Sequence, residues 1–589
     1  MAGLVSVLSI AKDALGVQQS AMEVASHNIA NVHTEGYSRQ RPVLETKQPA
    51  PYGGQLFGTG VGLDAIIRNV DQFVEARLLD RGMELASVRE KEIHMSVLEG
   101  LFNETTDRGL AAQFSVFWNA WHDLSNNPSG PAERRVLLEA GSRLAQGFED
   151  LAVEMTQIVN EINMALQAGI TRVNELTSRM AALNMQIMQM QTLGNANDLL
   201  DQRGQILTEL AEYLDIRSFE HQDGGITVMT KSGFVLTDKV YAYRLALEDN
   251  EVKWEGSGGA WISITDTLRT GKLGGWLDMR DAVIPKYQAD LDELARATIW
   301  EVNKIHTRGV GLSLYGPNRT LSSAYQTAGG LSGLTFGDRI DFSGSFNLWI
   351  GDRDGGNLQS AAIDLAALGI NEDSTLQDLC DGINDRIAAE GLVGLSVSVS
   401  GSGNRLAFSV DDSHTFGFSD DSASMLGALG IHTFFTGTGA TGMQVNPVIL
   451  SDPGLIAAGT LDPVTGETGV GDRSNALAMA DLQYLGATVR RWTFERGFAP
   501  TSVEVANIPL EDFYHALVSS VGLQSRSVQT AREYNEVIAN QLRQARDSIS
   551  AVSLDEEMAD MIKYQHAFLA AAKLISAADD MLRSLIEAK

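Results

Sequence analysis

The residues of this chain that could do chemistry are mainly acids, together with ten histidines and one cysteine. Asp352-Arg-Asp-Gly-Gly-Asn357 has the acidic spacing that begins a calcium loop. However, Ile363 stands at the twelfth position, where such a loop needs a bidentate glutamate. Gly58-Thr-Gly-Val-Gly62 has the glycine spacing of part of a dinucleotide-binding loop, but no strand–helix unit surrounds it. We therefore interpret both segments as turns rather than ligand sites.

Sequence motifs for catalysis are absent. The chain contains no P-loop sequence, no His-Glu-x-x-His zinc motif and no Gly-x-Ser-x-Gly nucleophile motif, and no two histidines lie four residues apart. Cys380 is the only cysteine, which excludes an intramolecular disulfide and a thiol-based zinc site, so we expect a buried structural thiol. The sequence predicts a protein that is not an enzyme, with no catalytic residues, no metal ligands and no cofactor.

The 589-residue chain is strongly acidic. It has 75 acidic against 45 basic residues, a formal charge of −30, and no lysine between Lys304 and Lys563. Such a surface repels phosphate backbones and anionic membranes, so we expect neither a nucleic-acid nor a membrane partner. No apolar run reaches the ~18 residues of a spanning helix, and the N-terminus lacks the basic start and cleavage site of a signal peptide. If the protein leaves the cell, we expect export without a cleaved signal.

The two ends of the chain have the most regular apolar spacing, at the heptad positions by which one helix packs along another. The seam residues are Leu4, Leu8, Leu15, Met22 and Ile29 near the start, and Met558, Met561, Phe568, Ile575 and Leu582 near the end. Ser553-Leu-Asp-Glu556 predicts a capping box that begins the last helix. The matched lengths predict that the terminal helices pack as a coiled coil. Alanines and polar residues occupy many positions of both seams and leave little apolar surface to bury. We therefore expect the terminal helices to be fully ordered only when neighbouring subunits pack around them.

Between the ends, helical and strand patterns alternate. A helical block is predicted from 68 to 215, with a long helix at about 132–192, and another helix at about 278–306. Period-2 patterns predict strands around 226–228, 241–247, 340–350, 395–399 and 406–410. Thr375 and Asp378 predict a capping box for a helix between two of these strands.

The expected fold class is multidomain α+β and elongated. The predicted parts are a terminal coiled-coil domain (1–67 with 530–589), a helical inner domain (68–215 with 278–310 and 471–529), a β-rich segment (216–277) and a mixed β/α outer domain (311–470). If the terminal helices pack together, the middle of the chain must project away from them.

The most specific segment is Ser26-His-Asn-Ile-Ala-Asn-Val-His-Thr-Glu-Gly-Tyr-Ser-Arg-Gln40. Physically it ends the first helix and turns the chain, with Gly36 suited to a positive φ. It resembles the N-terminal signature of the flagellar rod, hook and hook-associated axial proteins, usually written Asn-Ile-Ala-Asn-x-x-Thr-Pro-Gly-Tyr, with Glu35 in place of proline. The matching residues are Asn28, Ile29, Ala30, Asn31, Thr34, Gly36, Tyr37, Ser38, Arg39 and Gln40. The continuation 38–40 is similar to the hook-associated branch of that family.

The opposite end is similar to the C-terminal signature of the same family. The residues that carry this likeness are Ser553, Leu554, Asp555, Glu556 and Gln565. The segments 200–210, 271–276 and 303–306 also resemble inner parts of the hook-associated branch, whereas 311–470 matches only loosely.

The resemblance implies a structural subunit that joins hook to filament outside the cell, after export by the flagellar type III apparatus. It implies assembly at the distal end of the hook as a homo-oligomeric ring or short tube. The implied partners are other copies, the hook protein, the next hook-associated junction protein and an export chaperone, for which Met558–Ile586 is the expected site. A hook or rod subunit, a secreted hydrolase with a flagellar export end, and flagellin are the alternatives. Subunit number and the contacts of 311–470 stay open.

Overall fold

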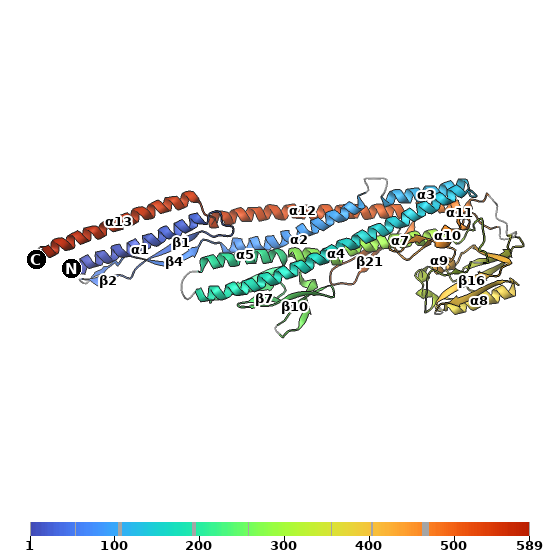
Figure 1. Cartoon of the computed structure of the whole chain (residues 1–589), viewed down its shortest axis with the longest axis horizontal. Helices are drawn as coiled ribbons and strands as arrows, with labels where there is room; N and C mark the ends of the chain where they lie inside the picture. Colours follow the sequence, from blue (N-terminus) through green and yellow to red (C-terminus); the bar gives the residue numbers. More distant parts are fainter. Residues whose placement is uncertain are drawn as a thin grey trace. The chain divides into compact units, whose positions relative to one another are not determined.

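The computed structural model describes residues 2–52, 55–103, 109–190, 196–256, 258–317, 319–354, 356–401, 404–461 and 471–587 (Figure 1). The chain forms two compact units. The first unit comprises Met1–Ile93, Glu161–Met279 and Arg526–Lys589, and the second comprises His94–Asn160 and Arg280–Ser525. Residues of three long helices, α2 (Gln72–Phe102), α4 (Pro131–Met190) and α12 (Leu510–Ser550), are divided between the two units.

In the first unit, the N-terminal helix α1 (Ala2–Ala30) packs along the C-terminal helix α13 (Leu554–Glu587), as predicted from the two seams (Figure 1). The fully buried positions along α1 are mostly small, among them Ala11, Val17 and Ala21, and Ala571 and Ala578 lie on α13. Small side chains let two helix backbones approach closely, which accounts for the narrow seam.

Beside α1, the first unit contains a long hairpin of β1 (Gln40–Thr46) and β4 (Val61–Arg68), with a bulge after Val43, and a short ribbon of β2 (Ala50–Tyr52) and β3 (Gln55–Phe57). These strands were not predicted, because no face of the hairpin is continuously buried and no period-2 pattern arises. The glycine-rich segment 58–62 leads into β4, with φ +111° at Gly60, and its last two residues already belong to that strand.

The rest of the first unit combines helices with two antiparallel sheets. Its helices include α5 (Asn197–Tyr213), α6 (Gly271–Asp278) and the short η1 (Thr265–Thr267). One sheet has the order β5-β6-β7-β8 (Ile216–Glu220, Ile226–Thr230, Val235–Asp238, Tyr241–Ala242), and the other β11-β10-β9 (Trp261–Ser263, Glu251–Glu255, Leu245–Glu248). Gly271 has φ +74°, and a Cβ there would meet the Tyr213 backbone, so only glycine fits this contact between α5 and α6.

Helices of the second unit surround an aromatic core. They are α3 (Leu110–Asn126), α7 (Ile284–His306), which follows the π-helix Met279–Val283, α9 (Met425–Leu429), α10 (Pro447–Ser451) and α11 (Ser474–Asp481). Phe117, Trp118 and Trp121 of α3 are fully buried, and Phe117 and Trp121 contact Phe434. The segment after Asn126 separates α3 from the long helix α4.

Strands of the second unit form two three-stranded sheets and two ribbons. The sheets are β14-β13-β17 (Gln359–Asp364, Ser345–Asp352, His414–Ser419) and β12-β16-β15 (Leu321–Ser322, Arg405–Val410, Leu395–Ser400). The ribbons are β18 with β19 (Phe435–Thr436, Gln444–Val445) and β20 with β21 (Ala487–Thr493, Thr501–Ile508). Helix α8 (Leu376–Ala389) packs on β15, and short turns η3 to η6 lie at Leu331–Gly333, Gly337–Arg339, Pro453–Leu455 and Leu482–Tyr484.

Local predictions in the second unit have mixed outcomes. The capping box of Thr375 and Asp378 is confirmed at the start of α8. The strand predicted around 340–350 begins only at Ser345, because Asp341 accepts hydrogen bonds from the backbone and hydroxyl of Ser343 and forms a turn there. The segment 352–357 turns from β13 towards β14, as interpreted, although Gly355 lies outside the described residues.

None of the helices in the described residues has both the length and the apolar run that a membrane crossing needs.

Candidate functional site

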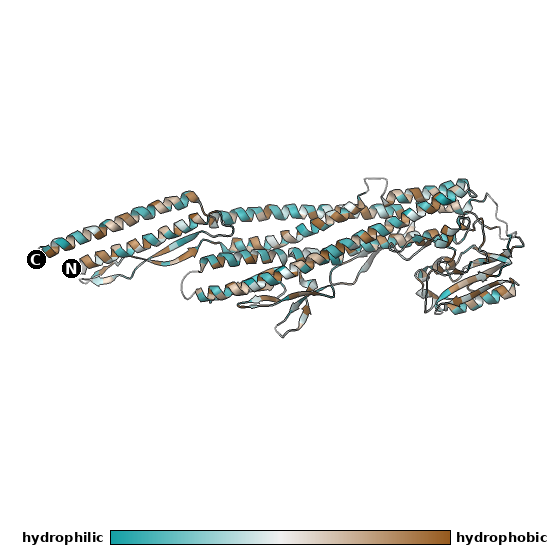
Figure 2. Cartoon of the chain, in the orientation of Figure 1, coloured by the Kyte–Doolittle hydropathy of each residue, from teal (hydrophilic) through white to brown (hydrophobic). Residues whose placement is uncertain are grey.

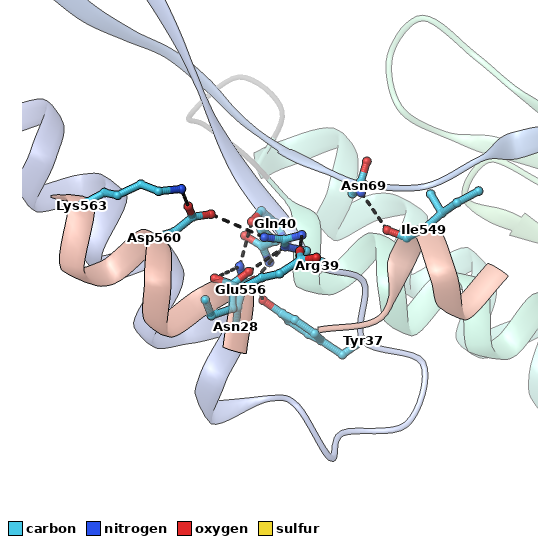
Figure 3. A network of polar contacts seen from close by, with 10 residues as sticks. Asn28, Tyr37, Arg39, Gln40, Asn69, Ile549, Glu556, Asp560 and Lys563 are labelled. Carbon is cyan, nitrogen blue, oxygen red and sulfur yellow. Dashed lines mark hydrogen bonds and ion pairs between the residues drawn. The ribbon is translucent and has the colours of Figure 1, made fainter. Parts of the chain in front are cut away.

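The signature segment and the start of α13 meet in a cluster of polar side chains, which we call the polar joint: Asn28, Tyr37, Arg39, Gln40 and Glu557 (Figure 3). Asn28 lies near the end of α1, the next three residues lead into β1, and Glu557 lies in the first turn of α13. The joint therefore gathers three chain segments within the first unit.

The Asn28 amide is the centre of the polar joint and is 1% exposed. Its Nδ2 donates to the Gln40 carbonyl (2.8 Å) and to Glu557 Oε2 (3.0 Å). Its Oδ1 accepts from the Gln40 N–H (2.9 Å) and the Tyr37 hydroxyl (2.8 Å). A buried amide can leave no donor or acceptor unpaired without cost, and only an amide offers both kinds of group here. Asn28 is therefore required by geometry and not only by its helix-ending tendency.

Glu557 is a nearly buried carboxylate, 3% exposed. Its Oε1 accepts from Arg39 Nε at 2.6 Å, while Arg39 also donates to Glu556 Oε2 at 2.6 Å and lies 3.6 Å from Asp560. Burial lowers the pKa of the Arg39 guanidinium, but Glu557 and Glu556 more than offset this and raise it above its ordinary value. Arg39 therefore stays charged and compensates the buried carboxylate.

Tyr37 is held as a hydrogen-bond donor. Burial raises the pKa of its phenol, and the carboxylates of Asp198, Asp201 and Glu557 raise it further. The phenol therefore keeps its proton at neutral pH and donates to Asn28.

Two aspartates of α5 hold the other side of the signature segment, Asp198 from the first turn and Asp201 from just beyond it. Asp201 accepts from the Ser38 N–H (3.0 Å) and from Arg68 of β4 (2.9 Å), and Asp198 accepts from the Gln40 side chain (2.9 Å). Carboxylates are favoured in the first turn of a helix, where backbone N–H groups are unpaired. The N-terminus of α5 thus fixes where the chain enters β1.

The turn before the joint follows the predicted chemistry. Asn31 donates to the His27 carbonyl (3.0 Å), and Thr34 donates to Asn31 Oδ1 (3.1 Å). Gly36 has φ +75°, and a Cβ there would collide with the Gln205 side chain, which donates to the Glu35 carbonyl. A residue other than glycine would therefore be doubly disfavoured at position 36.

The same segment also terminates α12. The Arg39 N–H donates to the Ser550 carbonyl (2.9 Å), and Asn69 Nδ2 donates to the Ile549 carbonyl (2.7 Å; Figure 3). The last carbonyls of a helix have no partner within the helix, so these two donors stabilise its end. The end of α12, before the break to α13, is therefore held jointly by the signature segment and by Asn69, which follows β4.

The structure brings together only part of the residues singled out from the sequence. Asn28, Tyr37, Arg39 and Gln40 lie in the joint, and Glu556 lies at its edge. Ala30, Thr34, Ser553, Leu554, Asp555 and Gln565 are exposed. Of the seam residues, Met558 is 57% exposed, whereas Leu4, Leu8, Leu15, Met22, Ile29, Met561, Phe568, Ile575 and Leu582 are half-buried.

Sequence reasoning missed Glu557, Asp198 and Asp201 as members of this site. The position of Glu557 could have been found from the spacing of α13. If the heptad of the last helix is counted from Glu557 instead of Met558, the residues that follow at 4-3-4 spacing are Met561, Tyr564 and Phe568. The two aspartates of α5 carry no such signal.

The joint has the chemistry of a structural fastening. Its donors and acceptors are directed at one another. Among the described residues, no three His, Cys, Asp or Glu side chains are grouped as a metal ion would require.

Three family models match the chain. "Flagellar hook-associated protein FlgK helical domain" matches residues 95–318, "Flagella basal body rod protein" matches 8–37, and "Flagellar basal body rod FlgEFG protein C-terminal" matches 543–588. The second and third models cover the two ends that meet at the polar joint.

Curated relatives match from end to end. Flagellar hook-associated protein 1 of Bacillus subtilis is 25% identical over 98% of this chain and 97% of its own length. The proteins of the same name from Salmonella typhimurium and Escherichia coli are 24% and 23% identical over 99% of both chains. The solved structure of the flagellar hook junction protein FlgK from Burkholderia pseudomallei covers 80% of this chain and all of its own, at 17% identity and a TM-score of 0.48.

The helical-domain match lies between the two axial-protein matches, and the relatives align over nearly the whole length. Over nearly its whole length the chain is therefore similar to flagellar hook-associated protein 1, and its two ends and helical middle match models of flagellar proteins.

Proposed function

We propose that this chain is the structural subunit that joins the hook of the flagellum to its filament. Copies are exported and assemble at the distal end of the hook, and the filament assembles beyond them. The observation that carries this proposal is the end-to-end match to hook-associated relatives, over 98–99% of the chain. The proposed role is structural rather than catalytic.

In this proposal the terminal helices form the inner tube of the assembly. Support comes from apolar surface that one copy leaves uncovered. Figure 2 shows apolar residues along α13, and Met558, Ile562, Leu569, Leu574 and Met581 are each more than half exposed. The seam residues of α1 are only half-buried. Exposed apolar surface of this extent favours contacts with further copies.

The polar joint is the proposed connection between the tube-forming helices and the rest of the first unit. It fixes the start of α13 against the end of α1 and ends α12 at the same place. A subunit that joins two assemblies needs such a fastening, since a polar network with every group paired resists partial opening.

The proposed partners are other copies in a ring or short tube, the hook protein, the next hook-associated junction protein and an export chaperone. We assign the chaperone to the exposed apolar residues of α13, between Met558 and Ile586. The proposed location is the outside of the cell, reached without a cleaved signal.

The proposed function is tested by electron microscopy of cells that lack this protein, with flagellin assayed in the medium. Hooks without filaments, with flagellin lost to the medium, are the expected result. Missing hooks would instead indicate a hook or rod subunit, and intact filaments would refute the junction role.

The inner-tube role is tested separately with Leu15→Asp and Leu582→Asp. Each places a charge on a half-buried seam, so both should abolish incorporation into flagella while the second unit keeps its fold. Val393→Asp changes a residue that is 76% exposed in the second unit and serves as the matched control. Normal incorporation of the two seam variants would count against the tube.

A further inference from the structure

The last helix of the chain, α13, exposes two methionine side chains. Met558 is 57% exposed and Met581 is 53% exposed. Methionines in the interior of the two units, such as Met83, Met155 and Met180, are 0% exposed. The two methionines of α13 are therefore open to small solutes from which the interior methionines are protected.

Each exposed methionine belongs to an apolar line along α13, where Figure 2 shows apolar residues from end to end. Residues four or seven positions apart share one side of a helix. The two lines have this spacing, and their members are between 49% and 57% exposed: Met558, Ile562 and Leu569 in one, and Leu574, Met581 and Leu585 in the other. Each line thus contains one sulfur atom among aliphatic side chains.

A methionine thioether is oxidised by a peroxide without help from a base or a metal. The sulfur lone pair attacks one oxygen of hydrogen peroxide and forms an S–O bond, while the O–O bond breaks. The attacked oxygen passes its proton to the departing hydroxide, which leaves as water. The sulfide loses two electrons to give the sulfoxide, and the peroxide is reduced. The product is polar, whereas methionine is a flexible apolar side chain.

We propose that Met558 and Met581 are modification sites for peroxides, and that their sulfoxides prevent the subunit from adding to the assembly. The inference rests on the proposed function, in which the exposed apolar surface of α13 contacts further copies. A sulfoxide places a hydrogen-bond acceptor where a neighbouring copy offers apolar groups, and burial of that acceptor without a partner costs free energy. Methionine sulfoxide reductases restore the thioether, so the block is reversible.

The modification itself is tested by treating the purified full-length protein with hydrogen peroxide and following each methionine by peptide mass spectrometry. Met558 and Met581 should gain one oxygen atom at least about tenfold faster than Met83 and Met155, because oxidation follows exposure. Oxidation of the two α13 residues at the rate of the interior methionines would overturn the proposal.

The effect on assembly is tested by supplying variants to cells that lack the protein. Met558→Gln with Met581→Gln places uncharged polar side chains at both sites and should lower the number of filaments about tenfold. Met558→Leu with Met581→Leu keeps both lines apolar without a sulfur atom and should restore filaments to within about twofold. Equal filament numbers for the two pairs, whether high or low, would contradict the proposal.

The matched control is Met164→Gln on α4. Met164 is 67% exposed, so it should be oxidised as readily as the two α13 residues, but it lies outside the two apolar lines. This variant should therefore restore filaments in normal number. A loss as large as that of the glutamine pair on α13 would show that exposed methionines matter wherever they lie, and would overturn the assignment to α13.

Export has to be separated from assembly, because the export chaperone is also assigned to α13. The glutamine pair should appear in the medium, exported but not incorporated, and circular dichroism of the purified variant should match that of the unchanged protein. Absence of the variant from the medium, with normal amounts inside the cell, would mean that the two positions act in export and would overturn the proposed block of assembly.

These outcomes are distinct from failure of the proposed function. If deletion of the protein leaves filaments intact, the junction role fails. If deletion removes the filaments but the glutamine pair restores them in normal number, the oxidation proposal fails alone.

Discussion

An asparagine side chain pairs with both backbone groups of a strand residue in each unit, but the surroundings of the two pairs differ. In the second unit, Asn384 bonds Val397, 13 residues along the chain. In the first unit, Asn28 bonds Gln40 in the same way, and it also bonds Glu557, 529 residues away. The first pair closes a strand edge locally, and the second fastens both ends of the chain.

The difference shows how one side-chain geometry serves two purposes. Loss of Asn384 exposes one backbone position at the edge of a sheet, where water can replace the amide. Loss of Asn28 removes hydrogen bonds from three partners at once, including one oxygen of a buried carboxylate. We therefore expect the joint to be far more sensitive to substitution than the closed edge.

The largest effect is expected for Asn28→Leu. It removes the side-chain partner of both backbone groups of Gln40 and one hydrogen bond each from the Tyr37 hydroxyl and Glu557 Oε2, and should destabilise the joint by about 3–4 kcal/mol. Hydrogen exchange of peptides covering 36–44, together with swarming motility, measures the effect. Asn384→Leu is the matched control and should cost about 1–2 kcal/mol without loss of motility. Equal effects of the two variants would remove the distinction between joint and edge.

A smaller effect is expected for Glu557→Gln, compared with Glu556→Gln at the neighbouring position. Because Glu557 is buried against Arg39, its neutralisation should cost about 2–3 kcal/mol. Glu556 is 63% exposed, so its change should stay within about 0.5 kcal/mol. The free energy of opening at the start of α13, from hydrogen exchange, distinguishes the two. A larger effect at Glu556 would mean that the exposed ion pair, not the buried one, holds the joint.

A pH effect is expected in the second unit, at two histidines that are buried in neutral form. His306 Nδ1 donates to the His432 carbonyl, and its Nε2 accepts from the Ala457 N–H. His432 Nε2 lies 3.1 Å from the Gly309 carbonyl, to which it donates, and its Nδ1 lies 2.6 Å from the Tyr315 hydroxyl. A proton on His306 Nε2 would face the Ala457 N–H, so both nitrogens of His306 have partners only while its ring is neutral.

Burial lowers the pKa of His432 to about 4, and burial with the neighbouring His432 and Arg134 lowers the pKa of His306 well below its ordinary value. The unfolded chain then binds more protons below about pH 6.5, so the free energy of unfolding falls as pH drops from there towards 4. Asp421 opposes this, because burial raises its pKa to about 6 and its contribution is lost as pH rises. Because two histidines act against one aspartate, the free energy of unfolding should fall by about 2 kcal/mol as the pH drops from about 6.5 towards 4.

This prediction is checked by hydrogen exchange of peptides around 300–310 and 430–436 at pH 7 and pH 4.5. His432→Gln should make the pH dependence shallower, since glutamine does not titrate. Unchanged exchange across this range would show that the cluster is not the acid-sensitive part of the unit.

The smallest effect is expected for Tyr37→Phe. The change removes one hydrogen bond to Asn28 but leaves the half-buried ring in place, so it should cost about 1 kcal/mol at the joint. Exchange of the 36–44 peptides measures it, with Tyr241→Phe, at an exposed position of β8, as the control. A cost equal to that of Asn28→Leu would make the phenol, not the amide, the centre of the joint.

Periodicity was enough to predict the long elements and the pairing of the terminal helices, because apolar residues recur over many turns there. The larger seam residues of α1 are only half-buried, since its most buried positions are occupied mainly by alanine and valine. The hairpin of β1 and β4 was missed because its faces are only partly buried. Long, regular burial is readable from sequence, and short or partly exposed elements are not.

The polar joint was only half predictable. The signature marked Asn28, Tyr37, Arg39 and Gln40 by resemblance, and turn chemistry explained Gly36. The spacing of α13 could have placed Glu557 on a buried face, but its pairing with Asn28 could not be predicted, because the two residues lie 529 positions apart. Sequence spacing describes what one helix buries, whereas the partner of a buried charge is set by tertiary structure.

The most direct test of the account is a double-mutant cycle on Arg39→Leu and Glu557→Leu, read as the free energy of opening of the 36–44 segment by hydrogen exchange. If the buried ion pair fastens α13 to the signature segment, each single change leaves the other charge without its partner. The double variant should then be less destabilised than the sum of the singles by at least about 1.5 kcal/mol. Effects that add within about 0.5 kcal/mol would contradict the polar joint as a coupled fastening of the two chain ends.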